Sequence, residues 1–213
     1  MKKILLPFIL LSALLTGCGD TTTVIVQEEG PTAAELFDEG RAFFNEGNFN
    51  PAIDSFNQAV RRDPSYADAH YWSGRSYEKL ANNQGAISAY QAALDVQPGH
   101  SDANLRIGVV YFKSYKYVPA ETFLNKAKHL NPASPYAHYF LAEIYKKQGK
   151  CQKPKSLYQK ALTLKPGFLD AKEGLAYVKR HNCKAATPAP KKPVYEKVNT
   201  FQGGGKALKE SEW

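Results

Sequence analysis

Cysteine is scarce in this chain: three of its 213 residues are cysteines, and no two of them form a Cys-x-x-Cys pair. That spacing is typical of thiol–disulfide exchange proteins, so its absence argues against this activity. The most apolar stretch, residues 4–15, is shorter than the ~20 residues that a membrane-spanning helix needs. The sequence also lacks a phosphate-binding loop, a metal-ligand spacing and paired carboxylates suited to acid–base catalysis. We therefore expect a non-enzymatic protein without catalytic residues, metal or another cofactor.

The start of the chain has the pattern of a secretory signal, with two lysines before the apolar run 4–15 and small residues after it. The run ends in Leu-Thr-Gly-Cys at residues 15–18, which resembles the lipobox of bacterial lipoproteins. The resemblance implies that signal peptidase removes residues 1–17 and that lipid, such as palmitate, is attached at Cys18. Several acyl chains on one residue give a stable membrane anchor. The alternative is an ordinary secretory signal with a chance cysteine.

A lipidated Cys18 places the mature chain in the bacterial envelope. In enteric-type sorting, an aspartate directly after the lipidated cysteine retains a lipoprotein at the inner membrane, and Gly19 takes that place here. We therefore expect the outer membrane, on its periplasmic side. Residues 18–32 are short, polar and marked by glycine, proline and threonine, which predicts a flexible tether.

The end of the chain, residues 184–213, contains three prolines, six lysines and a run of three glycines. This composition favours a disordered tail. Within it, residues 192–201 alternate apolar and polar side chains, so the segment is either disordered or a strand-like peptide that docks in a groove. Between tether and tail, residues 33–183 are long enough for one domain.

That domain is repetitive. Prolines fall at residues 64, 98, 132 and 166, with a constant step of 34 residues. Position 27 of each repeat is alanine, position 8 is glycine or alanine, and position 24 is Phe, Tyr, Leu and Tyr in turn. In these positions the chain resembles the tetratricopeptide repeat family. The four units are residues 33–66, 67–100, 101–134 and 135–168.

The resemblance implies an all-α fold, a right-handed superhelical solenoid of four helix–turn–helix units with a capping helix in residues 169–183. The apolar pattern agrees, because positions 4, 7, 8 and 11 and positions 20, 24 and 27 have helical spacing. Small residues at positions 8, 20 and 27 let two helices approach closely, and large side chains at positions 11 and 24 fill the space beside them. The proline at position 32 ends the second helix.

The resemblance also implies that partners bind on the inner face, which the first helices form roughly with positions 2, 5, 9 and 12. The high aromatic content predicts a groove for an extended peptide or a helix, although some rings are expected to pack between neighbouring helices. The same positions also hold Glu78, Val109, Glu143 and Arg180. The predicted partner-binding groove consists of Phe37, Arg41, Phe44, Tyr71, Arg75, Leu105, Phe112, Tyr136, Tyr139, Lys146 and Tyr177.

One subtype of the family is excluded by these residues. Members that hold chaperone C-terminal carboxylates use a lysine- and asparagine-rich clamp at positions 5 and 9. Here those positions hold Phe37 and Arg41 in the first unit and Leu105 and Val109 in the third. The clamp is therefore not present.

With lipid on Cys18, two cysteines remain, and the repeat register places them at the same edge of the solenoid. Cys151 is at position 17 of the fourth unit and Cys183 at position 15 of the capping unit. Packed helices lie ~8–10 Å apart, while a disulfide needs α-carbons ~4.4–6.8 Å apart, so the turn must lean toward the cap. We predict a disulfide that fastens the capping helix. A zinc site with His181 is the alternative.

Charge is uneven along the domain. Residues 33–100 carry 5 basic and 9 acidic side chains, whereas residues 101–183 carry 15 basic and 5 acidic ones. The basic half either keeps the domain soluble or attracts an anionic partner. Nucleic acid is not an expected partner, because the chain is exported and offers no recognition element beyond charge.

These features favour a lipid-anchored scaffold that recruits or assembles envelope proteins. Such a protein would be similar to the pilotins of type IV pilus secretins or to adaptor lipoproteins of cell-wall enzymes. The alternative is a structural tether that binds peptidoglycan through the basic half and the tail.

Overall fold

The computed structural model describes residues 30–150 and 152–181. Three predictions thus lie outside the described residues: lipidation at Cys18, the Cys151–Cys183 disulfide and docking by residues 192–201. In the described ranges the chain forms nine α-helices and no strand, and none of these helices is long and apolar enough to cross a membrane. The helices are α1 (Ala33–Glu46), α2 (Phe49–Arg62), α3 (Ala67–Lys79), α4 (Asn83–Val96), α5 (Ser101–Lys113), α6 (Tyr117–Leu130), α7 (Pro135–Lys147), α8 (Gln152–Leu164) and α9 (Leu169–Arg180).

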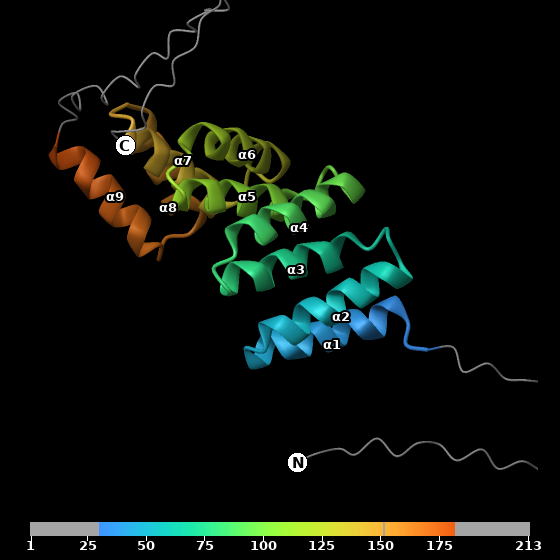
Figure 1. The fold of residues 1–213 in the computed structure, drawn as a ribbon. Coiled ribbons are helices and arrows are strands. Elements are labelled where there is room, and N and C mark those ends of the chain that lie inside the picture. Colours follow the sequence, from blue (N-terminus) through green and yellow to red (C-terminus); the bar gives the residue numbers. More distant parts are fainter. Residues whose placement is uncertain (1–29, 151, 182–213) are drawn as a thin grey trace, which may run out of the picture. The chain divides into compact units, whose positions relative to one another are not determined.

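The helices stack in chain order. Each helix packs against the next one from α1 to α9, as the labels in Figure 1 show. Further contacts join α1 with α3, α5 with α7, and α7 with α9, while an ion pair between Glu78 and Arg106 joins α3 with α5. The odd-numbered helices thus form one surface, which we call the first-helix face. The predicted all-α solenoid is confirmed.

Side chains ahead of α1, α5 and α7 satisfy N–H groups that have no partner within the helix. Thr32 and Glu35 form a capping box: the Thr32 hydroxyl accepts from the Glu35 N–H at 3.2 Å, and the Glu35 carboxylate accepts from the Thr32 N–H at 2.9 Å. His100 Nδ1 accepts from the Ala103 N–H at 3.2 Å, and the Ser134 side chain caps α7. These caps fix where each of these helices begins.

The turn inside each unit contains one residue with left-handed backbone. Gly47, Ala81, Tyr115 and Gly149 have φ angles of 84°, 57°, 58° and 70°. All four occupy position 15 of their units. Glycine adopts this conformation readily, whereas it costs other residues roughly 1–2 kcal/mol. Two of these four turns therefore carry backbone strain.

Small residues on the first helices let the second helices pack closely. An added Cβ at Gly40 would lie 2.6 Å from the ring of Phe56, and one at Gly74 would lie 2.6 Å from the ring of Tyr90. Both rings are fully buried. The side chain at position 24 thus fills the space that glycine leaves at position 8, as the sequence pattern predicts.

The last helix has one buried side. Ala171, Gly174 and Val178 are buried in α9 against Tyr158 and its neighbours, whereas Ala176 is exposed. Among the described residues no second helix follows α9. α9 therefore covers the core at the end of the fourth unit and leaves its other side in solvent.

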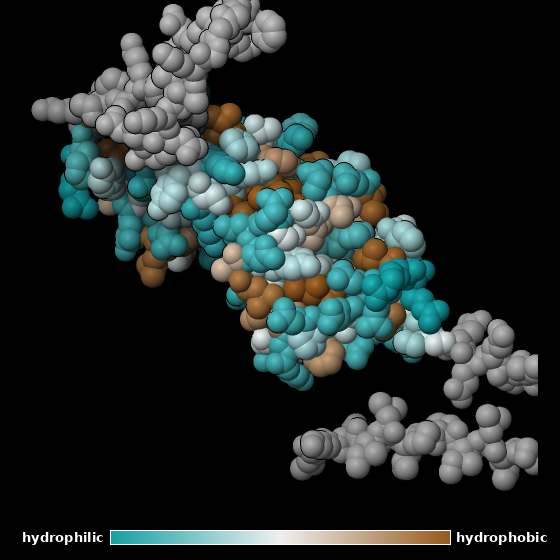
Figure 2. All heavy atoms as spheres, in the orientation of Figure 1, coloured by the Kyte–Doolittle hydropathy of each residue, from teal (hydrophilic) through white to brown (hydrophobic). Residues whose placement is uncertain are grey.

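Apolar side chains reach the surface in separate patches. Figure 2 shows them over α3 and α5 on the face in view, surrounded by polar side chains. Exposed large apolar residues include Tyr115, Val118, Tyr136, Leu169 and Tyr177. Two of them, Tyr136 and Tyr177, belong to the predicted groove.

Candidate functional site

Solvent reaches the predicted groove residues to different degrees. Phe37 and Tyr71 are only 8% and 9% exposed, so they pack beneath the first-helix face. Tyr136 and Tyr177 are 42% and 49% exposed, and Arg41 is also exposed. The remaining groove residues are half-buried: Phe44, Arg75, Leu105, Phe112, Tyr139 and Lys146. Most of the set therefore presents part of each side chain to a ligand.

Between α1 and α3, two arginines lie on aromatic rings. The guanidinium carbon of Arg41 is 4.7 Å from the ring centroid of Trp72, and that of Arg75 is 4.6 Å from the same centroid. Arg75 also lies 5.1 Å from the ring centroid of Phe44, which meets Trp72 edge-on. We call these four residues the arginine–tryptophan cluster.

The contact between α3 and α5 is polar. The Glu78 carboxylate accepts a hydrogen bond from the Tyr90 hydroxyl at 2.5 Å, and its Oε2 lies 3.8 Å from Nη1 of Arg106. Burial, followed by the charge of Glu78, raises the pKa of Tyr90 far above its usual range. The Tyr90 hydroxyl therefore stays a donor, and Glu78 is occupied from two sides.

A pocket of about 340 Å³ lies between α5 and α7. Phe140 lines this pocket, and Phe112 packs edge-on against it with ring centroids 5.5 Å apart. The hydroxyl of Tyr136 accepts a hydrogen bond from Nζ of Lys165 at 2.8 Å, which holds this exposed ring. Two cations, Arg106 and Lys113, line the pocket. The other lining residues are Leu105, Val109, Tyr136 and Phe140.

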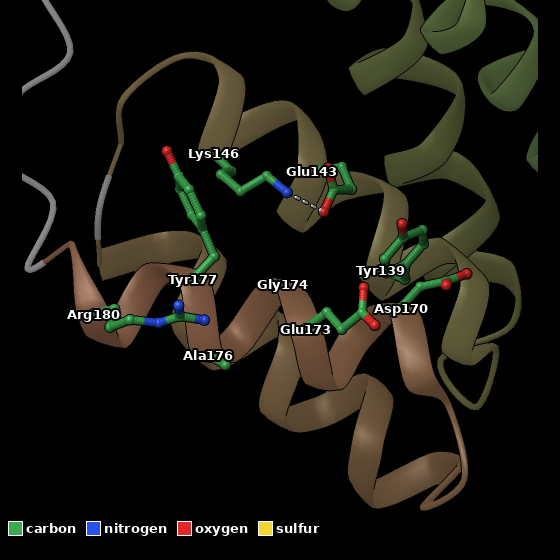
Figure 3. A pocket seen from close by; sticks show the side chains of 9 residues that line it. All are labelled: Tyr139, Glu143, Lys146, Asp170, Glu173, Gly174, Ala176, Tyr177 and Arg180. Atoms are coloured by element: carbon green, nitrogen blue, oxygen red, sulfur yellow. Dashed lines mark hydrogen bonds and ion pairs between the residues drawn. The ribbon is translucent and has the colours of Figure 1, made fainter.

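A pocket of about 590 Å³ lies between α7 and α9 (Figure 3). Tyr139, Glu143 and Lys146 reach it from α7. Three of the predicted groove residues, Tyr139, Lys146 and Tyr177, meet here. The residues from α9 are Asp170, Glu173, Gly174, Ala176, Tyr177 and Arg180.

Glu143 organises one wall of this α7–α9 pocket. It is 8% exposed, and its Oε1 accepts hydrogen bonds from Nζ of Lys146 at 2.6 Å and from the hydroxyl of Tyr158. Lys146 Nζ also lies 5.5 Å from the ring centroid of Tyr177. Burial, followed by the charge of Glu143, raises the pKa of Tyr139 to about 12, so its hydroxyl is neutral at physiological pH. The network holds Lys146 beside the pocket with its charge compensated.

The remaining charges of the pocket are separated. Figure 3 shows Asp170 and Glu173 on the side of Tyr139, and Arg180 at the other end of α9 on the side of Tyr177. The side chains of all three charged residues are exposed. Among the residues that the structure describes, none of the three forms an ion pair. The pocket therefore offers a ligand one acidic end and one basic end.

Sequence reasoning missed three residues of the first-helix face. Trp72, Arg106 and Phe140 all occupy position 6 of their units. Position 6 lies on the same helical stripe as positions 2 and 9, at spacings of four and three residues. This spacing was therefore a usable signal for these residues.

The two histidines at position 4 are packing residues. His138 is buried and its Nε2 lies 3.0 Å from the carbonyl oxygen of Pro132, while His70 is half-buried. Burial lowers the pKa of both rings. Within residues 30–150 and 152–181, no group of three histidine, cysteine or acidic side chains is placed to hold a metal ion.

Three protein-family models match the chain. One is described as a TPR repeat and matches residues 40–80, and two are described as tetratricopeptide repeats and match residues 79–144 and 135–168. Together these matches extend from residue 40 to residue 168. A comparison with curated protein sequences finds no significant match.

Several solved structures share the fold. MamA from Desulfovibrio magneticus RS-1 is 22% identical with a TM-score of 0.64, over 70% of this chain and 85% of that one. TTC0263, a TPR protein of Thermus thermophilus, is 25% identical with a TM-score of 0.58, over 70% and 81%. YrrB, described as a TPR protein with an unusual peptide-binding site, is 19% identical with a TM-score of 0.58, over 66% and 73%.

Proposed function

This chain belongs to the tetratricopeptide repeat family, and from that premise we propose that it is a non-enzymatic scaffold that binds a peptide or helix of another protein on its first-helix face. Lipid on Cys18 anchors it in the bacterial envelope, at the periplasmic side of the outer membrane. There it recruits or assembles envelope proteins. The lipobox-like residues 15–18 support the anchor, and the first-helix face supports the binding role.

The α7–α9 pocket is the observation that carries this proposal. Tyr139 and Tyr177 offer rings on which apolar side chains of a peptide pack, and aromatic residues are typical hot spots of protein interfaces. Asp170 and Glu173 suit a basic group of the ligand, and Arg180 suits an acidic one. The likeness to YrrB, whose description names a peptide-binding site in that protein, is consistent with this use of the fold.

Site-specific photocrosslinking in the native bacterium tests the binding role. A benzophenone amino acid in place of Tyr177 is expected to form a covalent adduct with the partner. The matched control places it at Gln159, which is exposed on α8. Charge reversal by Asp170→Lys with Glu173→Lys is expected to remove the adduct at Tyr177. The absence of an adduct at Tyr177, or the same adduct from Gln159, would count against the pocket.

A peptidoglycan tether remains the second candidate, because the excess of basic side chains in residues 101–183 suits an anionic cell wall. Lys150 and Lys153, for example, are exposed and lie 5.3 and 5.2 Å from the ring centroid of Tyr145. This function predicts co-sedimentation with purified sacculi that salt weakens. It also predicts that deleting residues 184–213 reduces binding, while Asp170→Lys with Glu173→Lys does not.

A further inference from the structure

In the arginine–tryptophan cluster (Arg41, Phe44, Trp72 and Arg75) on the first-helix face, both guanidinium groups rest on aromatic rings. The guanidinium carbons of Arg41 and Arg75 lie 4.7 and 4.6 Å from the same ring centroid, that of Trp72. In the part of the chain that the structure describes, neither arginine forms an ion pair with a carboxylate. The cluster thus contains two positive charges without a protein counter-charge in contact.

Acidic side chains lie close to both arginines in the sequence, but they form no ion pair with either guanidinium group in the described part of the chain. Asp38 precedes Arg41 by three residues and Glu78 follows Arg75 by three, a spacing at which helical side chains meet. Glu78 is occupied by the Tyr90 hydroxyl and by Arg106. The two arginines therefore remain available to an external anion.

Stacking leaves the hydrogen-bonding edge of a guanidinium group free. The N–H donors of arginine lie in the plane of the group and point outward, so a group whose flat face rests on a ring still donates two parallel bonds to a carboxylate. Arg41 is exposed and Arg75 is half-buried, so a ligand on the first-helix face can reach them. Trp72 limits the motion of both arginine side chains and Phe44 that of Arg75, which lowers the entropy lost on binding.

We propose that the arginine–tryptophan cluster binds a single acidic side chain, aspartate or glutamate, of the partner peptide, next to an apolar residue that packs on Phe44. This rests on the proposed function, because it names the chemistry of a partner on the same face. The local field selects a single acid: residues 33–100 carry 9 acidic and 5 basic side chains, so an acid-rich ligand is repelled.

Two peptide pools that differ only in the side chain of one residue test this site. Both are dye-labelled, acetylated and amidated heptapeptides with the same random mixture of apolar, small and basic residues at six positions. The central residue is glutamate in one pool and glutamine in the other. The protein is the full chain with Trp213→Phe, purified in a neutral detergent, which leaves Trp72 as its one tryptophan. Dye anisotropy measures binding anywhere, and Trp72 emission reports on the cluster.

The glutamate pool is expected to bind about tenfold more tightly, the factor typical of a hydrogen bond to a charged group, and to change Trp72 emission. Arg41→Gln and Arg75→Gln are each expected to reduce that preference to less than about threefold. Arg62→Gln, at an exposed site on α2, is the matched control and is expected to keep it.

Equal binding of the two pools, or a glutamate preference that survives Arg41→Gln with Arg75→Gln, overturns this inference and leaves the peptide-binding face standing. If neither pool binds by anisotropy, the proposed function fails and this inference fails with it. Circular dichroism of each variant checks that the helices are retained.

Discussion

The left-handed turn residue can be compared across four units of one chain. Glycine occupies it at Gly47 and Gly149, whereas Ala81 has a φ of 57° and an exposed side chain that gains little from packing. We predict that Ala81→Gly stabilises the domain by about 1 kcal/mol, because it removes the strain of a Cβ in this conformation. The shift in the urea midpoint at constant m-value measures it.

The same substitution inside a helix is the control for that prediction. Ala42 is exposed on α1, where the backbone is helical. Ala42→Gly is expected to destabilise by about 0.5–1 kcal/mol, since glycine loses more freedom in a helix than alanine does. Destabilisation of similar size by both substitutions would show that position 15 is not strained.

Protonation of His138 is expected to oppose folding. The ring is buried, its Nδ1 has no hydrogen-bond partner in the described part of the chain, and burial lowers its pKa from 6.5. Below pH 6.5 the unfolded chain binds a proton that the folded chain does not, so the free energy of unfolding falls as pH decreases toward the folded pKa. Above pH 6.5 the ring is neutral in both states and contributes no slope.

We therefore predict that His138→Gln reduces the loss of stability between pH 7 and pH 5, measured by urea unfolding at several pH values. His129, which is exposed near the end of α6, provides the control His129→Gln. An unchanged slope in His138→Gln, or an equal change in His129→Gln, would contradict the assignment. His70 is retained in both variants and keeps its own part of the slope, because burial lowers its pKa as well.

At the scale of elements, the attachment of α9 depends on close contact at Gly174. An added Cβ there would lie 2.5 Å from the ring of Tyr158, whose hydroxyl is bonded to Glu143 and whose side chain is fully buried. We predict that Gly174→Val destabilises the α8–α9 contact by roughly 1–3 kcal/mol, as overpacking does. Hydrogen exchange of the α9 amides is expected to accelerate, while that of α1–α4 stays the same, because units contact only their neighbours.

Ala176→Val is the matched control for this change. Ala176 lies two residues further along α9 with an exposed side chain, so its enlargement is expected to leave amide exchange in α9 unaltered. Unchanged amide exchange of α9 in Gly174→Val would contradict the prediction. It would mean that the Tyr158 ring moves aside at no energetic cost, although it is buried and hydrogen-bonded to Glu143.

The helices could be predicted from the sequence, but the exposure of each ring could not. The proline step of 34 residues and the helical spacing of apolar residues are local patterns, and they determine the all-α solenoid. Burial at position 5 depends instead on packing by residues that are distant in the sequence, among them the residue 29 positions later. Tyr66 lies on Phe37 and His100 on Tyr71, each with ring centroids 4.9 Å apart. In the third unit Leu105 meets no such ring, because the equivalent residue is a serine.

The candidate site was also only partly predictable, because its parts come from different pairs of helices. Position numbers suggested Tyr139, Lys146 and Tyr177, which do share the α7–α9 pocket. They did not suggest Trp72, whose role follows from two arginines on neighbouring helices that both stack on its ring. Such stacking depends on which carboxylates already pair with other groups, as Glu78 does with Tyr90 and Arg106. Only the folded structure shows these pairs.

At the scale of the whole molecule, the proposed attachment at Cys18 would decide where the first-helix face meets its partners. The apolar run 4–15 is too short to hold the chain in a bilayer by itself, whereas several acyl chains on one residue give stable attachment. We predict that radiolabelled palmitate is incorporated into the wild-type chain and that Cys18→Ser abolishes the label and moves the chain out of the membrane fraction. Cys151→Ser, which also removes one thiol, is expected to stay labelled and membrane-bound. Label that persists in Cys18→Ser would exclude Cys18 as the anchor, and label that also disappears in Cys151→Ser would show that its loss is not specific to Cys18.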